Sequence, residues 1–327
     1  MRELSRQPEF AGGCAPTLGP MTASARIDEF ESLRPYLLSV GYRLTGSVAD
    51  AEDAVQDAWL RWDALGEDWS GIADLRAWLT TVVSRIGLDR LRSAARRRET
   101  YVGEWLPEPV VTGLDRTDPL SAVVAAEDAR FAAMVVLDRL TPDQRVAFVL
   151  HDGFAVSFTE IAGVLGVNPA AARQLASRAR RAVADAEAPA RDPSHDEVVG
   201  RLMAAMAAGD MAAVVELLHP DVTFTGDSNR KAPTAPRVIH GADKVARFVF
   251  GLARRYGPRF FEAGELALVN GDLGLCTAGL PADGEWPAMA PRIQALTVRD
   301  GKVCAIWDVA NPDKFTASPM APGRRRY

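Results

Sequence analysis

The chain has 327 residues, of which 48% are hydrophobic and 25% charged, and its formal net charge at pH 7 is −5. These fractions are typical of a soluble globular protein with two or three domains. No apolar run approaches the roughly 18 to 20 residues that cross a bilayer, and Met1 to Pro20 lacks a signal-peptide core. We therefore expect a cytoplasmic protein without a membrane partner.

The cysteines are Cys14, Cys276 and Cys304. Their number is odd and their spacing is not that of metal ligands, so the sequence favours buried, reduced thiols over a disulfide or a zinc site. We expect no cofactor and no metal.

The negative net charge argues against a nucleic-acid partner only if the charge is evenly spread, and it is not. The arginines between residues 85 and 98 oppose only Asp89 and Glu99, whereas acidic residues gather between residues 50 and 57. Two surfaces of opposite charge predict two different partners.

Residues 1–25 are rich in Gly, Pro, Ala and Ser without periodicity, which predicts a disordered start. From Ile27 the pattern becomes helical, and one apolar stripe consists of Ala51, Ala54, Val55, Ala58, Trp59, Trp62 and Leu65. The opposite face carries Asp50, Asp53 and Asp57. A merely solvated acidic face is the ordinary interpretation, and a docking surface is the alternative.

A second helical pattern covers residues 75–91 and runs into the basic cluster. Its apolar positions include Trp78 and Leu79, and the polar positions expected outside include Thr80 and Ser84. Arginines beside polar and aromatic side chains suit the binding of a separated DNA strand. A solvated basic helix end is the plainer interpretation. The candidate DNA contacts are Arg76, Trp78, Arg85, Arg90, Arg92, Arg96 and Arg97.

Residues 100–128 contain prolines and scattered polar residues, which predicts a linker. The linker includes the run Trp105-Leu106-Pro107-Glu108-Pro109. Trp105 and Leu106 are too apolar for a solvated tether, so we expect them to dock on the rest of the protein.

Two helix starts follow in tandem. Ser157 and Glu160 form a capping box, and the helix that they open breaks at Gly166. Asn168 is an N-cap before Pro169. This pattern predicts a helix-turn-helix, with an αα-hairpin and a solvated basic face as the alternative. The candidate DNA contacts of its second helix are Ala170, Arg173, Gln174, Ser177, Arg178 and Arg181, of which Arg173 and Gln174 are placed for base edges.

After a second linker at residues 188–194, a helix pair and several β-rich runs separated by glycines predict an α+β cone at residues 195–316. Residues 317–327 form a basic tail.

Long matches give a family resemblance. Residues 26–99, with YRLTGSVADAEDAVQDAWLRW and LRAWLTTVVSRIGLDRLRSAARRRE, resemble region 2 of an extracytoplasmic-function sigma factor. Residues 129–187, with LTPDQRVAFVLHDGFAVSFTEIAGVLGVNPAAARQLASRARRAV, resemble region 4. The resemblance implies two all-α sigma domains that bind core RNA polymerase and promoter DNA.

The resemblance also assigns each surface a partner. The helix around Asp50, Asp53 and Asp57 would dock on the clamp helices of the β′ subunit, and the polymerase β subunit is a further partner. The segment from Arg76 to Arg98 would melt and read the −10 element, and Arg173 to Arg181 would read the −35 element. We expect a monomer when the protein is free.

Residues 195–316 resemble the SnoaL-like branch of the nuclear-transport-factor-2 fold, and the combination resembles the SigJ-type group of sigma factors. The group's linker and terminal motifs stand intact, and its middle motif, usually aspartate, three glycines and lysine, keeps only its ends. The lost glycines put in doubt a role that needs a bare backbone at residues 228–230. The residues expected to regulate the sigma domains are Trp105, Leu106, Pro107, Glu108, Pro109, Asp227, Lys231, Asn311, Pro312, Asp313 and Lys314.

Three functions compete on the sequence alone. The first is a sigma factor modulated by its own C-terminal domain, for which a small-molecule ligand is left open. The second is a one-component helix-turn-helix regulator, which would need neither the acidic helix nor the segment from Trp78 to Arg98. The third is an enzyme of the SnoaL-like type with a DNA-binding appendage. His219, Asp221, His240, Trp307 and Asp308 show no spacing that fixes a catalytic geometry, so we expect no enzyme.

Overall fold

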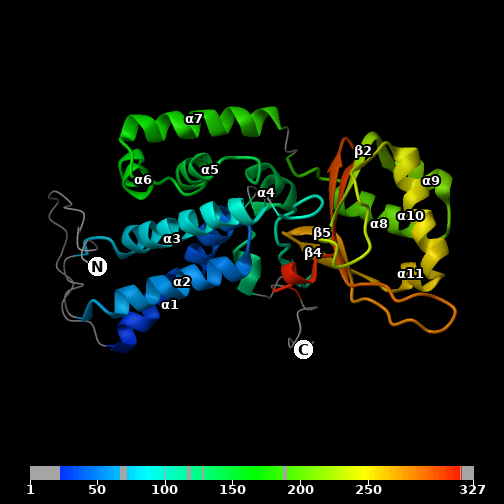
Figure 1. Ribbon diagram of the computed structural model, residues 1–327, viewed down its shortest axis with the longest axis horizontal. Helices are drawn as coiled ribbons and strands as arrows, with labels where there is room; N and C mark the ends of the chain where they lie inside the picture. The colour runs from blue at the N-terminus through cyan, green and yellow to red at the C-terminus, as the bar shows by residue number, and fades with distance from the viewer. Residues whose placement is uncertain are drawn as a thin grey trace.

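The computed structural model describes residues 23–66, 72–98, 100–115, 119–126, 129–186, 190–316 and 318. Within these ranges the chain forms two helical bundles and an α+β domain (Figure 1). No helix in the described ranges is both long and apolar enough to cross a membrane. The predicted disordered start and basic tail lie outside the described residues, apart from residues 23–25 and Ser318. Residues 23–25 are helical, so the prediction of disorder is wrong there.

The N-terminal bundle consists of α1 (Ala23–Thr45), α2 (Val48–Asp63) and α3 (Leu75–Arg98). Gly46 turns the chain between α1 and α2 with φ of 71°, a conformation that suits glycine. Ser47 then caps α2, since its side chain accepts a hydrogen bond from the amide of Asp50. The predicted apolar stripe faces inward and Asp53 and Asp57 are exposed on the other side; its buried residues are Ala51, Ala54, Val55, Ala58 and Trp62, whereas Trp59 and Leu65 are half-buried.

The central bundle contains the predicted helix-turn-helix. Its helices are α4 (Phe131–Leu137), α5 (Pro142–Phe148), a π-helical turn η4 (Val149–Gly153), α6 (Phe158–Leu165) and α7 (Pro169–Asp185). The structure confirms the capping box of Ser157 and Glu160, the left-handed Gly166 after α6, and Asn168 as the N-cap of α7. These local signals were readable because both partners of each cap lie within three residues.

The cone domain has helices α8 (His195–Ala207), α9 (Met211–Leu217), α10 (Ala242–Tyr256) and α11 (Arg259–Glu262). Its strands are β2 (Leu218–Asp227), β3 (Ile239–His240), β4 (Gly264–Val269), β5 (Asp272–Thr277), β6 (Arg292–Arg299) and β7 (Lys302–Val309). A short 3-10 helix, η5 (Pro312–Lys314), follows β7.

The linker supplies the seventh strand of this sheet. Its strand β1 (Val111–Thr112) pairs antiparallel with β4, and the strand order is β1-β4-β5-β6-β7-β2-β3. The β2 and β7 pair is parallel, and the other pairs are antiparallel. The linker is therefore part of the cone domain's sheet as well as the connection between the bundles.

Both faces of the sheet are covered. On one face, apolar side chains of β2, β6 and β7 pack against α8, α9 and α10. On the other face, Ile293 and Val309 pack against Leu106 of the linker and Phe131 and Val135 of α4. Figure 1 shows the sheet standing between the two bundles and the helices of the cone domain.

A separate apolar core runs through both bundles, with Val110, Val123 and Val124 of the linker included. Helix α3 lies inside this arrangement, because it packs against α1 and α2 and also against α5 and α6. For this reason the prediction that Thr80 and Ser84 lie outside is wrong. Thr80 is buried and donates to the carbonyl of Arg76, and Ser84 is fully buried.

Candidate functional site

The linker motif, the middle motif and the terminal motif meet at one buried carboxylate, that of Asp227 at the end of β2. Its Oδ2 accepts the amide of Leu106 at 2.8 Å and the Nζ of Lys314 at 2.6 Å, and its Oδ1 accepts the hydroxyl of Tyr101. The side chain of Asp227 has no exposed surface. The linker run, the middle motif and the terminal motif are thus joined around a single charge.

Lys314 lies under the aromatic side chains of the linker. Its Nζ is 3.4 Å from the centroid of the Trp105 ring and donates to the carbonyl of Leu106. An ammonium in this position is stabilised by the ring as well as by the Asp227 carboxylate. Lys314 is therefore buried beside the linker, at 6% exposed, whereas its neighbour Asp313 is exposed.

Tyr101 joins the same cluster from the start of the linker. Its hydroxyl accepts a hydrogen bond from Nδ2 of Asn311 at 2.9 Å and donates to Asp227. Burial, and then the hydrogen bond to the Asp227 carboxylate, raise the pKa of the Tyr101 phenol. The hydroxyl therefore keeps its proton and remains a donor.

Two residues of the middle motif have a backbone conformation that favours glycine. Asn229 and Arg230 have φ of 46° and 59°, in the left-handed region that favours glycine. Lys231, which ends the motif, forms an ion pair with Asp313 at the surface. The doubt raised by the lost glycines therefore does not extend to the backbone conformation.

The second half of the linker run contacts the N-terminal bundle. Glu108 is 4% exposed, and its Oε2 accepts hydrogen bonds from the hydroxyl of Ser47 at 2.9 Å and the amide of Val48 at 2.8 Å. Its Oε1 accepts the hydroxyl of Thr316. Pro107 and Pro109 on either side are also buried, whereas Pro312 in the terminal motif is exposed.

Asn270, in the turn between β4 and β5, connects the cone domain by hydrogen bonds to the linker and to both bundles. Its Nδ2 donates to the Tyr42 hydroxyl and to the carbonyl of Ala129, both at 2.7 Å, and its Oδ1 accepts the amide of Val110 at 3.0 Å. Tyr42 donates in turn to the carbonyl of Glu108 at 2.9 Å. The residue reaches both bundles and the linker at once.

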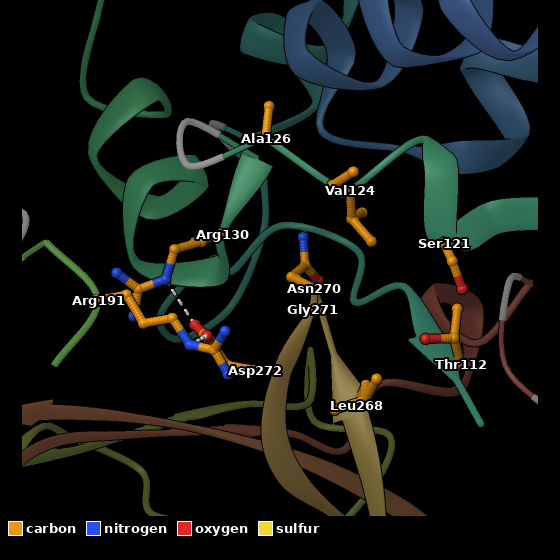
Figure 2. A pocket seen from close by; sticks show the side chains of 11 residues that line it. Thr112, Ser121, Val124, Ala126, Arg130, Arg191, Leu268, Asn270, Gly271 and Asp272 are labelled. Carbon is orange, nitrogen blue, oxygen red and sulfur yellow. Dashed lines mark hydrogen bonds and ion pairs between the residues drawn. The ribbon is translucent and has the colours of Figure 1, made fainter. Parts of the chain in front are cut away.

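A charged cluster lies beside Asn270. Arg130, just before α4, and Arg191, between α7 and α8, both point toward Asp272, at distances of 2.6 and 3.2 Å from its carboxylate oxygens (Figure 2). A small cavity of about 60 Å³ adjoins the cluster and is bordered by Thr112 and Ser121. This junction fixes the central bundle on the cone domain.

The acidic face of α2 is partly engaged within the bundle. Arg90 of α3 lies 2.5 Å from Asp50 and 3.3 Å from Asp53, while Asp57 is exposed. The prediction of two separate surfaces is therefore wrong at Arg90, which joins them. A surface hollow of about 520 Å³ between α1 and α2 is bordered by Asp53 and Trp59.

The candidate DNA contacts of α3 have different neighbours in the structure. Arg85 donates to the carbonyl of Gly163 in α6 at 3.0 Å, and Arg92 pairs with Asp143 of α5 at 3.0 Å. Arg76 lies over the ring of Tyr36. Trp78 is half-buried and packs against the bundle core. The side chains of Arg96 and Arg97 lie outside the described residues.

The candidate contacts of α7 lie on one open face. Ala170, Arg173, Gln174, Arg178 and Arg181 are exposed and Ser177 is half-buried, while Ala172, Ala176 and Ala179 pack inward. Arg173 also lies 5.4 Å from the centroid of the Phe158 ring of α6. Helix α7 lies on the far side of α5 and α6 from α3 (Figure 1), so this face points away from the bundle junction.

The residues considered for catalysis do not form one group. His219, Asp221 and His240 lie at the β2–β3 edge, and the ring of His219 accepts the amide of Asp221. Asp308 is fully buried on β7, where it accepts hydrogen bonds from Thr234, Arg292 and Gln294.

Sequence reasoning missed several residues of the junction. They are Tyr42, Tyr101, Asn270, Arg130 and Asp272, together with Arg191 and Thr316. Their partners lie up to 228 residues away in the chain, and no spacing rule connects them. The only local signal is Asn270 before Gly271, a pair typical of a tight turn, and that signal concerns the turn alone.

Comparison with known families agrees with this geometry. Residues 30–97 match the model of Sigma-70 region 2, residues 130–183 that of Sigma-70 region 4, and residues 199–306 that of the SnoaL-like domain. The fold and these matches define the class: an RNA polymerase sigma factor of the sigma-70 type with a fused SnoaL-like domain. A one-component regulator or an enzyme with a DNA-binding appendage would not need region 2, so neither alternative is favoured.

Individual relatives narrow the class to a family. The chain is 71% identical over 301 residues to the ECF RNA polymerase sigma factor SigJ of Mycobacterium tuberculosis, covering 91% of this chain and 96% of that protein. It is 34% identical over 216 residues to a probable ECF sigma factor SigI of the same species, covering 65% and 71%. The crystal structure of M. tuberculosis SigJ matches with a TM-score of 0.80 and 70% identity, covering 90% of this chain and 99% of that one. The chain belongs to the extracytoplasmic-function family of RNA polymerase sigma factors.

Proposed function

We propose that this sigma factor exists in a closed state when free, in which its linker and cone domain hold the two DNA-binding bundles together. In the open state, the α2 face with Asp50, Asp53 and Asp57 docks on the clamp helices of the β′ subunit, and the central bundle meets the β subunit. Helix α3 melts and reads the −10 element, and α7 reads the −35 element. The cone domain and linker set the balance between the two states.

The observation that carries the proposal is the engagement of α3 by the central bundle. Arg85 and Arg92, both candidates for the −10 contact, are bound to Gly163 and Asp143 of that bundle. Asp143 partly neutralises the charge of Arg92, and both guanidinium groups are held toward the central bundle, so they are less available to DNA phosphates. Two bundles in direct contact also cannot reach promoter elements that lie several helical turns apart, at roughly 34 Å a turn.

The docked linker explains what holds this state. A stretch of about 30 residues could otherwise reach roughly 100 Å when extended. Here Leu106 is buried against the cone domain, and β1 adds to its sheet. The linker is shortened by these contacts, which keeps the bundles side by side.

In vitro transcription with core polymerase tests the proposal on the full chain and on two truncations, one ending at residue 194 and one at residue 310. We expect both truncations to change promoter activity, and to different extents, because the first loses the whole cone domain and the second only the segment that holds the linker. Hydrogen exchange over residues 100–115 should be faster in both. Core binding of each truncation, measured separately, separates assembly from activity. If both truncations keep wild-type activity and the hydrogen exchange of the linker is unchanged, the cone domain does not modulate the sigma domains.

A further inference from the structure

The first turn of α2 is capped by two residues from different parts of the chain. The first four amides of a helix lack partners within the helix. Ser47 supplies a local acceptor, which binds the amide of Asp50 at 3.3 Å. The amide of Val48 instead donates to Oε2 of Glu108, which lies 60 residues further along the chain.

We propose that Glu108 is a positioning residue for α2: a second N-cap that the linker supplies only while it is docked. Its carboxylate binds both the amide of Val48 and the hydroxyl of Ser47, the local cap itself. The order of the first turn then depends on the position of the linker. The inference rests on the proposed function insofar as α2 carries the polymerase-binding face.

Charge and burial make this cap stronger than a neutral one. A carboxylate at a helix N-terminus interacts favourably with the helix dipole, and hydrogen bonds to an ionised acceptor are about twice as strong as neutral ones. Glu108 is 4% exposed, so water competes little for its oxygens. Two backbone contacts fix the residue, since its amide donates to the carbonyl of Gly46 and its carbonyl accepts the hydroxyl of Tyr42, both at 2.9 Å.

The second carboxylate oxygen connects the cap to the C-terminal segment. Oε1 of Glu108 accepts a hydrogen bond from the hydroxyl of Thr316. Thr316 lies two residues after Lys314, and Lys314 itself binds Leu106 and Asp227. Helix α2, the linker and the terminal motif are therefore linked in series through one side chain. Movement of the terminal segment alters an acceptor that α2 needs.

The consequence for polymerase binding follows from where the acidic residues lie. Asp50 is in the first turn of α2, and its carboxylate binds Arg90 of α3. If the first turn frays, the acidic face has to be ordered again when polymerase binds. Loss of the cap also weakens the closed state, in which the linker is docked, so core affinity should change together with the protection of the turn.

Hydrogen exchange on the full-length protein tests the cap. In Glu108→Ala we expect the peptide covering residues 47–52 to exchange about fivefold faster, the factor that a typical capping loss implies. Glu108→Gln, which keeps one acceptor oxygen, should be intermediate. Glu104→Ala is the matched control, because Glu104 lies on the same linker and is exposed. Unchanged exchange in Glu108→Ala would overturn the proposal.

Thr316→Val is a second variant in case Glu108→Ala does not fold. Thr316 is exposed, and the substitution only replaces its hydroxyl with a methyl group. It should speed exchange in the same peptide by less than Glu108→Ala, with α3 unaffected. Unchanged exchange of residues 47–52 in Thr316→Val would show that the cap does not depend on the C-terminal segment.

Core binding by the same variants completes the test. We expect Glu108→Ala to change core affinity by up to about fivefold, the full contribution of the cap, and Glu104→Ala to bind as wild type does. Faster exchange with core binding unchanged from wild type would overturn the positioning role. Asp57→Lys distinguishes a failure of the positioning role from a failure of the proposed function. If Asp57→Lys binds core polymerase as wild type does, the α2 face is not the polymerase surface, and the cap is judged by hydrogen exchange alone.

Discussion

At the scale of single residues, the middle motif places two residues other than glycine in a backbone conformation that favours glycine. Asn229 and Arg230 have left-handed φ values of 46° and 59°. Asparagine tolerates this region because its short side chain bonds locally, whereas arginine has no such compensation. The strain at Arg230 is accepted in a turn whose ends, Asp227 and Lys231, both bind the terminal motif.

Replacing Arg230 by glycine should therefore stabilise the protein slightly. The left-handed conformation costs a non-glycine residue roughly 1–2 kcal/mol, and the extra freedom of glycine in the unfolded chain returns about 0.5–1 kcal/mol of this. We expect a net gain of about 0.5 kcal/mol for Arg230→Gly, measured as a higher urea midpoint. Ser228→Gly is the control, since Ser228 does not have a positive φ, and it should lower the midpoint. A lower midpoint for Arg230→Gly would mean that its side chain stabilises the turn.

At the scale of elements, the sequence predicted what depends on neighbours in the chain. The helix-turn-helix followed from caps within three residues, and the apolar stripe of α2 followed from helical spacing. The same spacing failed for α3, because a helix packed on two sides buries polar residues such as Ser84 that a one-sided pattern places outside. The strand β1 was missed because two residues carry no periodicity, and the pairing with β4 is set by a contact more than 150 residues away.

Helix α7 carries two proposed DNA contacts of different kinds, which can be tested separately. Arg173 lies in the second turn of the helix, and Arg178 lies further along the same exposed face. We expect Arg173→Ala to lose about 1–3 kcal/mol on the specific −35 sequence and little on random DNA. Arg178→Ala should weaken binding to both equally and reduce the salt dependence by about one phosphate contact. The measurement is DNA affinity over a range of salt concentrations for the full-length protein in complex with core polymerase. Equal losses on both sequences for Arg173→Ala would rule out base recognition by that residue.

At the scale of the whole molecule, the linker belongs to two of the three apolar cores of the described residues. Val110 enters the core of the bundles, and Leu106 and Val111 enter the core on the face of the sheet that packs against α4. The motifs named from the family resemblance supplied only part of this junction. Their partners in the bundles, such as Tyr42, could not be found, since nothing in the sequence near Tyr42 indicates Asn270 or Glu108.

The buried pair of Asp227 and Lys314 gives the last prediction, because it holds linker and cone domain together at a point that water does not reach. Asp227 has no exposed surface, and Lys314 is 6% exposed. In Asp227→Asn the ammonium stays buried without its counter-charge, which costs about 3–5 kcal/mol. In calorimetry we expect one transition for wild type and separate unfolding of the bundles and the cone domain for Asp227→Asn, with faster hydrogen exchange over residues 101–112.

Two further variants decide whether charge is the cause. Asp227→Asn combined with Lys314→Met removes both charges and should recover most of the lost stability, because replacing a whole buried pair is far less costly than breaking it. Lys231→Met removes the exposed ion pair with Asp313 between the same two motifs, and it should change stability by at most about 1 kcal/mol. If Asp227→Asn unfolds as wild type does, or if the double variant is no better than the single one, the buried pair does not hold the junction and the closed state depends on the apolar contacts of Leu106 and Val111.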